Sequence, residues 1–253
     1  MNVAYNMDCM EYMKTLPDNY FELCVADPPY GDALGNNTRF DFRNGQGRFD
    51  KYGAQERDGK PYNRIGGWFD RYKEPVEDGR DLGGEVRKKI IAWDVAPKKE
   101  YFDELFRVSR NQIIWGGNYF DLPPTRCFIV WRKLTISENF SMAMAEYAWT
   151  SFNDNAKVFE CAPQGKVGDE RFHPTQKPID LYRWLFSRYA KQGDKIFDPY
   201  LGSGSSRIAA YDAGLDFVGC EIDKTYFKKQ EERFANYTAQ LSLFSGFAQE
   251  EML

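Results

Sequence analysis

The fold is decided by the stretch Phe21-Glu22-Leu23-Cys24-Val25-Ala26-Asp27-Pro28-Pro29-Tyr30. Its apolar first half predicts a buried strand of a parallel sheet, and Asp27 marks the point where that strand ends. The two prolines cannot donate backbone hydrogen bonds and have a fixed φ, so the chain leaves the sheet stiff and extended. Open α/β sheets bind ligands at the carboxyl ends of their strands, so a carboxylate, free carbonyls and an aromatic ring are presented there.

These groups suit a planar base that carries an exocyclic amine. The Asp27 carboxylate and the Pro28 carbonyl can accept its two N–H protons, and the ring of Tyr30 can stack on the base. The tetrapeptide alone leaves one alternative open, a strand that is followed by an ordinary proline-rich turn.

A second stretch, Lys195–Arg207, predicts a strand, a glycine turn and the start of a helix. Gly202 and Gly204 form the turn, and the next predicted strand, near 216–220, ends at Glu221. Glycines let the backbone approach a ligand closely, and an acid at the end of the following strand can hold ribose hydroxyls. The pattern therefore predicts a nucleoside pocket.

The glycine turn does not match a phosphate-binding loop. It lacks the Gly-Lys-Ser/Thr of a P-loop, and Ser205-Ser206-Arg207 stands where a dinucleotide fingerprint has its third glycine. The Asp198 carboxylate would repel a pyrophosphate, and it favours a ligand with an ammonium or sulfonium group. S-adenosylmethionine combines both cations with adenosine, so these residues favour it as the cofactor.

Three motifs together resemble the β class of amino-group DNA methyltransferases, the adenine-N6 and cytosine-N4 family. They are Asp27–Tyr30, His173–Pro178 and Phe197–Gly204, and the resemblance covers most of 1–30 and 95–238. It implies a Rossmann-like, S-adenosylmethionine-dependent α/β fold with a mostly parallel seven-stranded sheet and one antiparallel strand. It also implies a circularly permuted motif order, with the catalytic motif ahead of the cofactor motif, and a target base that is flipped out of the duplex.

The residues and the resemblance together give two sets of site residues. The catalytic set is Asp27, Pro28, Pro29 and Tyr30. The cofactor-binding set is Asp8, Thr175, Lys177, Phe197, Asp198, Pro199, Gly202, Ser203, Gly204 and Glu221, of which Asp8, Thr175 and Lys177 enter only through the resemblance.

The target atom is expected to be N6 of adenine, because the family's tetrapeptide begins with Asp here, whereas Ser would favour cytosine N4. Cytosine-N4 methylation is the alternative within the family, and RNA is an alternative substrate. A catalytically silent module that senses the cofactor or binds DNA is an alternative of another class. The intact Asp27, Tyr30, Asp198, Gly202 and Glu221 argue against that module.

The composition narrows the chemistry further. With 253 residues and a net charge of −4, the chain can bury one α/β core, and any DNA-binding surface must be a local patch. A single histidine, His173, excludes a His-rich metal site, and its place among prolines favours a structural hydrogen bond. We expect no metal. No cysteine follows a proline, so the nucleophile for methylation at carbon 5 of cytosine is missing.

Cysteine usage and hydropathy predict the compartment. The five cysteines are scattered without a Cys-x-x-Cys pair and indicate buried thiols in a reducing environment. No apolar run approaches transmembrane length, and the N-terminus lacks a signal-peptide pattern. We therefore expect a cytoplasmic protein with no membrane partner.

The segment 31–92 differs from the rest of the chain. It contains just over half of the 21 glycines and little apolar periodicity, so we predict a mobile insertion that contacts DNA within a single catalytic domain, 1–253. An inert insertion is the alternative. The residues expected to bind DNA are Arg39, Arg43, Arg48, Lys51, Arg57 and Arg64.

Periodicity predicts strands near 2–6, 21–26, 111–115, 127–131, 143–149, 195–198 and 216–220, and helices near 9–15, 99–109, 178–190, 204–213 and 224–237.

The C-terminal tail, 240–253, begins with Gln240–Phe244, which resembles the bacterial sliding-clamp binding peptide. Short extended peptides with apolar anchors are a common recognition mode, and packing of these residues onto the core is the alternative. The oligomeric state stays open, with a homodimer as one option.

Overall fold

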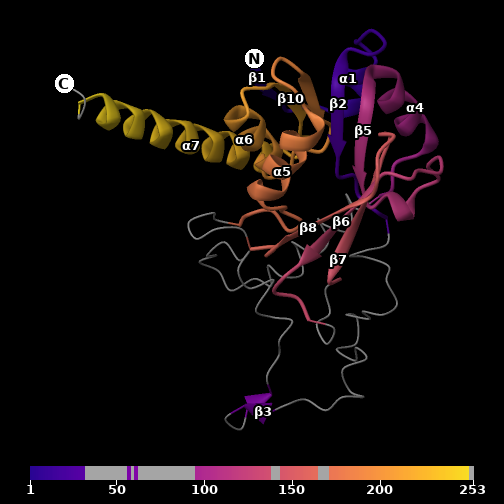
Figure 1. Cartoon of the computed structure of the whole chain (residues 1–253), viewed down its shortest axis with the longest axis horizontal. Coiled ribbons are helices and arrows are strands. Elements are labelled where there is room, and N and C mark those ends of the chain that lie inside the picture. The colour runs from indigo at the N-terminus through magenta and orange to yellow at the C-terminus, as the bar shows by residue number, and fades with distance from the viewer. Residues whose placement is uncertain (32–55, 58–59, 62–94, 138–142, 165–170, 251–253) are drawn as a thin grey trace. The chain divides into compact units, whose positions relative to one another are not determined.

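The computed structural model describes residues 1–31, 56–57, 60–61, 95–137, 143–164 and 171–250. The chain divides into two units, one formed by 1–28 with 98–253 and the other by 29–97. The first unit contains the large sheet and its helices (Figure 1).

In the second unit, strand β3 (Glu56–Arg57) pairs antiparallel with β4 (Lys60–Pro61), so that Arg57 lies opposite Lys60. Arg57 is the one expected DNA-binding residue whose backbone the structure describes. The others, Arg39, Arg43, Arg48, Lys51 and Arg64, lie outside the described residues, as does most of the predicted insertion.

Eight strands form the large sheet, in the order β1-β10-β9-β2-β5-β7-β6-β8. Neighbours from β1 to β5 run parallel, β7 runs antiparallel to both β5 and β6, and β8 runs parallel to β6. This confirms the mostly parallel sheet with one antiparallel strand, and β8 is an eighth strand beyond the predicted seven. The bounds are β1 (Asn2–Tyr5), β2 (Phe21–Ala26), β5 (Ser109–Trp115), β6 (Phe128–Lys133), β7 (Ala145–Thr150), β8 (Lys157–Cys161), β9 (Lys195–Asp198) and β10 (Asp216–Cys220).

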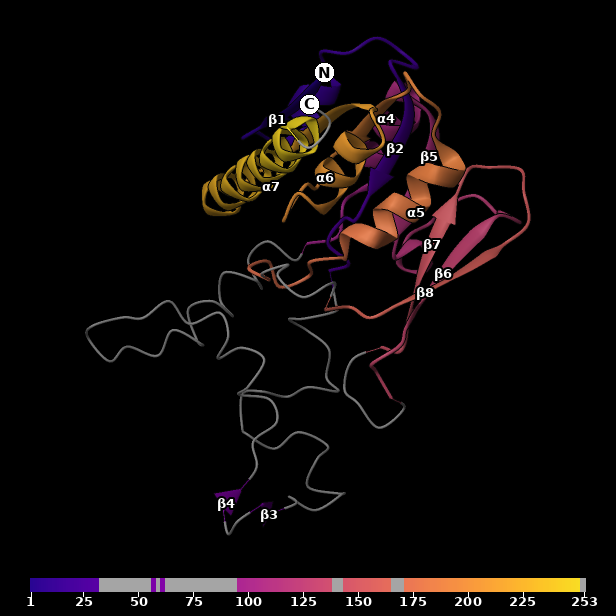
Figure 2. The ribbon, with the colours of Figure 1, turned by 60° about the vertical axis from the view of Figure 1, so that its left-hand side comes forward.

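Helices cover both faces of this sheet (Figures 1 and 2). On one face α5 packs against α6, on the other α1 packs against α4, and α7 contacts α6. The bounds are α1 (Cys9–Met13), α4 (Lys99–Val108), the 3-10 helix η3 (Gly117–Tyr119), α5 (Ile179–Tyr189), α6 (Ser205–Asp212) and α7 (Lys224–Glu250).

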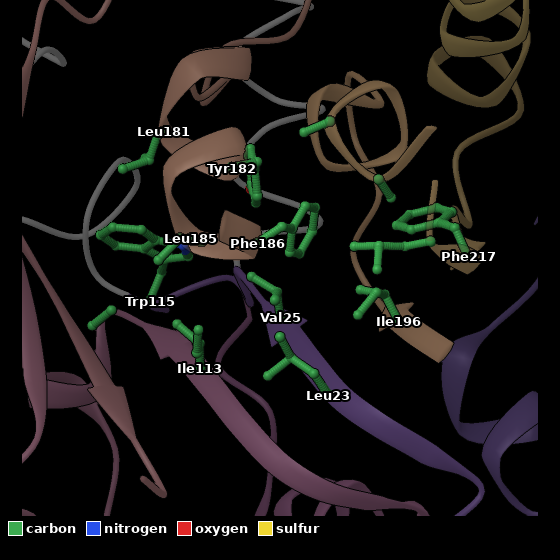
Figure 3. Packing of buried hydrophobic residues seen from close by; sticks show 14 of the residues in the cluster. Leu23, Val25, Ile113, Trp115, Leu181, Tyr182, Leu185, Phe186, Ile196 and Phe217 are labelled. Atoms are coloured by element: carbon green, nitrogen blue, oxygen red, sulfur yellow. The ribbon is translucent and has the colours of Figure 1, made fainter. Parts of the chain in front are cut away.

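Strand β2 shows how the sequence builds both halves of the core. Leu23 and Val25 are buried on the face that α5 covers, where they meet Leu185 and its neighbours (Figure 3). Cys24 and Ala26 are buried in the cluster that includes the residues of α4. Side chains alternate between the faces of a sheet, so a strand buried on both faces must be apolar throughout.

The strand order places a topological switch between β2 and β9. From β9 the chain runs through α6 to β10, toward one edge of the sheet, and from β2 it reaches β5 through α4, toward the other edge. Where connections leave neighbouring strands in opposite directions, open α/β sheets bind ligands at the carboxyl ends of those strands. The ends of β2 and β9 carry the two motifs that the sequence singles out.

Helix α7 is longer than its pattern predicts. The sequence predicts an end near residue 237, whereas the helix extends to Glu250, so Gln240–Phe244 is helical here and not an extended tail. The segment from 225 to 250 has no proline to interrupt a helix. Clamp binding by Gln240–Phe244 therefore stays a prediction that requires the end of α7 to unwind.

Across the part of the chain that the structure describes, no helix combines the length and hydrophobicity needed to cross a membrane.

Candidate active site

Three acids stand at the carboxyl edge of neighbouring parallel strands. Asp27 follows β2, Asp198 ends β9 and Glu221 follows β10. The register pairs Asp198 with Gly219, and it pairs the residue before Asp198 with Cys24, so the three strands end nearly level. The acids predicted from separate motifs are therefore neighbours on one edge.

The turn after β9 has a backbone that favours glycine. Gly202 has a φ of 52° and Gly204 a φ of 75°, both in the left-handed region. A Cβ added to Gly202 would lie 3.4 Å from the His173 ring, so the space around the turn is also limited. The N–H of Gly202 donates to Oε2 of Glu221 at 2.9 Å, which joins the turn to the acid of the next strand.

Glu221 is preorganised by backbone hydrogen bonds. Its Oε2 accepts the N–H of Gly202, and its Oε1 accepts the N–H of Asp223 at 2.8 Å. Burial raises the pKa of Glu221, and these hydrogen bonds partly offset that rise. A fixed carboxylate beside a glycine turn is suited to accept the hydroxyls of a ribose.

Asp198 lies under the turn and is 2% exposed. Its Oδ2 accepts a hydrogen bond from the Ser206 hydroxyl, and its Oδ1 accepts the N–H of Tyr200 at 3.0 Å. The pKa of Asp198 is raised to about 7, chiefly by burial and in smaller part by the nearby carboxylates of Asp27 and Glu221, while its two hydrogen bonds oppose the rise. A cationic ligand would favour the ionised form of this acid.

The segment His173–Pro178 lies beside the turn. The His173 ring packs against Gly202, and it meets the Tyr226 ring edge-on with centroids 4.3 Å apart. Its Nδ1 hydrogen-bonds with the hydroxyl of Thr175 at 3.2 Å. Burial lowers the pKa of His173 to about 3, so the imidazole is neutral at physiological pH.

Lys177 contacts Asp27, the first residue of the tetrapeptide expected to be catalytic. Its buried ammonium forms an ion pair with Oδ2 of Asp27 and lies 5.2 Å from the centroid of the Trp115 ring. Burial by itself would lower the pKa of Lys177, but the carboxylates of Asp27 and Glu146 together raise it. The lysine expected near the cofactor thus stays charged and contacts the carboxylate expected to receive the amine.

Three other expected cofactor residues have structural places. Asp8 caps α1, because its Oδ1 accepts the N–H of Met10 at 2.7 Å. The Phe197 ring is fully buried and stacks on Phe21 with centroids 4.8 Å apart. Pro199 is buried behind the glycine turn. These positions place Phe197 in the core, with its backbone at the edge of the sheet.

The tetrapeptide is divided between the two units of the chain. Asp27 and Pro28 belong to the unit with the large sheet, and Pro29 and Tyr30 belong to the unit 29–97. The structure therefore brings two of the four expected catalytic residues to the carboxyl edge.

Sequence reasoning missed three charged residues near the site. Glu146 on β7 lies 3.3 Å from Nζ of Lys177 and 2.5 Å from Nζ of Lys133, which ends β6. Arg233 on α7 donates to the carbonyl of Ser203 at 2.8 Å and so braces the glycine turn. An acid within an otherwise uncharged strand, Ala145–Thr150, is the signal that could have identified Glu146.

Comparisons with known proteins identify the family of the chain. The family model of the N6/N4 methylases, described as DNA methylase, matches residues 85–232, more than half of the chain. The type II methyltransferase M2.MboI of Moraxella bovis is 23% identical over 262 residues, covering 94% of this chain and 89% of that protein. The type II methyltransferase M.HinfI of Haemophilus influenzae is 22% identical over 273 residues, covering 92% and 68%.

A solved structure shares the fold. The cytosine-N4-specific PvuII DNA methyltransferase has a TM-score of 0.54 at 11% identity, covering 92% of this chain and 86% of that one. Because the family model matches more than half of the chain, the chain belongs to the N6/N4 DNA methylase family. It is a DNA methyltransferase that uses S-adenosylmethionine, as the motifs predict. The residues are chemically compatible with that cofactor, since the glycine turn, a carboxylate that can accept hydroxyls and a buried carboxylate that can attract a cation share one edge.

Proposed function

We propose that the chain methylates N6 of an adenine that is flipped out of DNA. The observation that carries this proposal is the carboxylate of Asp27 at the end of β2, which pairs with Lys177. Strand β2 lies next to β9, the strand that the glycine turn follows. An amine conjugated with its ring is a poor nucleophile because its lone pair is delocalised. Hydrogen bonds from the amine to Asp27 and to the Pro28 carbonyl favour a pyramidal nitrogen and localise the lone pair.

The other contribution of these residues to the rate is to hold the base in the orientation that the attack requires. Tyr30 stacks on the flipped base, which would otherwise lose its stacking partners in the duplex. Asp27 and Pro28 fix the direction of the nitrogen. Bringing two reactants into line in this way supplies a large part of a catalysed rate, and fixed charges supply much of the rest.

The cofactor side uses the second motif. S-adenosylmethionine, when bound, supplies a sulfonium methyl group that a nitrogen can attack in line. Glu221 accepts the ribose hydroxyls, the turn Gly202–Gly204 lets the backbone approach the ligand, and Asp198 faces its cationic part. Thr175 hydrogen-bonds with His173, which packs against this turn, and Lys177 pairs with Asp27. On these contacts we propose that Thr175 and Lys177 border the methionine end.

Binding of S-adenosylmethionine should depend on pH near neutrality. The Asp198 carboxyl has a pKa of about 7 and must be ionised to favour a cationic ligand. As the pH falls below this value, its protonation should weaken binding by up to roughly tenfold per pH unit. Calorimetric titration at several pH values measures this, and Asp198→Asn should remove the pH dependence. A Kd that stays constant between about pH 8 and about pH 6 in the wild type would contradict it.

We propose that DNA phosphates contact the basic residues of 29–97, namely Arg39, Arg43, Arg48, Lys51, Arg57 and Arg64. A triple variant in which Gln replaces Arg39, Arg43 and Arg48 should bind DNA more weakly. The slope of log affinity against log salt should decrease by about 3, because each phosphate contact releases about one counterion.

Binding titrations at several salt concentrations measure that slope. Arg126→Gln is the matched control, since Arg126 is an exposed arginine that hydrogen-bonds Asn155 in the unit with the large sheet. An unchanged slope in the triple variant would show that these arginines do not bind phosphates.

Labelled methyl transfer tests the proposed activity. Purified protein should incorporate label from S-adenosylmethionine into mixed-sequence duplex DNA and not into RNA. Label in RNA alone would assign another substrate. A protein that binds S-adenosylmethionine and DNA and labels neither nucleic acid would be the silent module.

We propose a restriction–modification setting in the cytoplasm, because the two relatives bear the name type II methyltransferase. A homodimer and binding of the sliding clamp by Gln240–Phe244 stay predictions. Clamp binding is tested by titration of purified clamp against the wild type and against a Leu243→Ala, Phe244→Ala double variant, which should not bind.

A further inference from the structure

Four charged side chains form a chain of contacts that ends at the catalytic carboxylate. Lys133 pairs with Oε1 of Glu146 at 2.5 Å, Lys177 lies 3.3 Å from Oε2 of Glu146, and Lys177 pairs with Asp27. The two lysine side chains are 6% and 5% exposed, so both cations are withdrawn from water. Positive and negative charges alternate along the chain, and each lysine contacts its own oxygen of Glu146.

Two tryptophan rings pack against the cations. Nζ of Lys177 lies 5.2 Å from the centroid of the Trp115 ring, and Nζ of Lys133 lies 5.1 Å from that of Trp131. The rings meet edge to face with centroids 6.3 Å apart, and both are buried. Aromatic faces attract cations, but a buried ammonium still requires carboxylate partners. The position of Lys177 is thus fixed by one ring and two acids.

The two acids that hold Lys177 differ in what else they do. Asp27 has to receive the N–H groups of a target amine, so its hold on Lys177 changes when substrate arrives. Glu146 belongs to β7 and its oxygens are shared between the two lysines. It can therefore keep Lys177 in place while Asp27 exchanges partners, which avoids an uncompensated buried charge.

We infer that Glu146 is a positioning residue for methyl transfer. It holds Lys177, and Lys177 in turn fixes the position of the Asp27 carboxylate that receives the target amine. The inference rests on the proposed function, because it takes Asp27 as the acceptor of the amine. Lys133 completes the arrangement by holding the other oxygen of Glu146. The titratable or charged groups around this chain of contacts are Asp27, Lys133, Glu146, His173, Tyr182 and Asp198.

The variant Glu146→Gln keeps the size of the side chain and removes its charge. We expect kcat for labelled methyl transfer to fall roughly 100-fold, because a misplaced acceptor spoils the alignment, while KM for S-adenosylmethionine stays within about twofold. The alkaline limb of the kcat–pH profile should move to lower pH, since Lys177 loses one of the two carboxylates that raise its pKa. Glu146→Asp, which keeps the charge, should recover part of kcat.

The matched control is Glu160→Gln on β8. Glu160 pairs with Arg132 of β6 at 3.0 Å, so its loss removes an ion pair between neighbouring strands at an exposed position. This variant should keep the wild-type kcat and pH profile. If Glu146→Gln does not fold, the double variant Lys133→Met, Glu146→Gln removes both charges of the pair and is measured instead, with the same expected loss and shift.

A folded Glu146→Gln or double variant with the wild-type kcat and alkaline limb would overturn the inference and leave the proposed function standing. A wild type that binds S-adenosylmethionine but transfers no methyl group would overturn the proposed function instead. In that case an NMR titration of the Lys177 ammonium tests whether Glu146 contacts Lys177 in solution. An equal pKa in wild type and Glu146→Gln would overturn it, and a lower pKa in the variant would support it.

Discussion

Replacing Asp27 by Asn is expected to lower kcat for methyl transfer by roughly 10³-fold, because the amine loses a charged acceptor that is fixed in place. The amide keeps the size of the side chain but gives up the charge that pairs with Lys177. The Kd for S-adenosylmethionine should change by less than about threefold, because the cofactor motif is untouched. Initial rates and calorimetric titrations on the same preparation separate these two effects.

Asp103→Asn is the matched control for this substitution. Asp103 pairs with Lys99 on α4 at 2.6 Å and is exposed, so the variant removes an Asp–Lys pair away from the site. It should keep the wild-type kcat. Near-normal turnover by Asp27→Asn would contradict the proposed mechanism, and loss of cofactor binding by a folded variant would move Asp27 to the cofactor site.

The second large effect is expected at Glu221, where Glu221→Ala should raise the Kd for S-adenosylmethionine roughly 100-fold. The substitution removes the acceptor proposed for the ribose hydroxyls, and it leaves the N–H groups of Gly202 and Asp223 without their carboxylate. At saturating cofactor, kcat should return to within a few-fold of the wild type because Asp27 is unchanged. Calorimetry and saturation kinetics measure the two quantities.

Glu232→Ala is the control for Glu221→Ala, since Glu232 is exposed on α7 and lies 3.8 Å from Lys228. Its Kd should equal that of the wild type. A folded Glu221→Ala variant with unchanged affinity would exclude the ribose role. A kcat that stays low at saturating cofactor would assign Glu221 to the chemical step.

The carboxyl edge of the sheet could be predicted because its residues are encoded locally. An apolar run ends at Asp27, a glycine turn follows Asp198, and another apolar run ends at Glu221. Buried parallel strands align their ends, so three local patterns are sufficient to place three acids on one edge.

The contacts among the charges behind Asp27 could not be predicted in the same way. Lys133, Glu146 and Lys177 come from β6, from β7 and from the segment before α5, and they meet only because β7 inserts between β5 and β6. Each position taken alone is compatible with an exposed charge. The order of the strands, which no single segment encodes, decides that they are buried together.

Strand β8 was missed for a related reason. Lys157–Cys161 mixes charged and apolar residues. Phe159 and Cys161 pack against the core, whereas Val158, next to Phe159, is 62% exposed at the edge of the sheet, so the apolar residues do not all fall on alternate positions as in a half-buried strand. The pairing of β8 with β6 forms the strand. Helix α7 likewise continues past its last periodic residues, where hydrophobic spacing gives no signal for its end.

The identity of the methylated base is the decisive observation for the proposed transfer to adenine N6. Purified protein is incubated with S-adenosylmethionine and mixed-sequence DNA, the DNA is digested to nucleosides, and these are identified by mass spectrometry. We expect N6-methyladenine, with the yield reduced to background in Asp27→Asn. N4-methylcytosine as the product, or no methylated base from a protein that binds both S-adenosylmethionine and DNA, would contradict the proposed transfer.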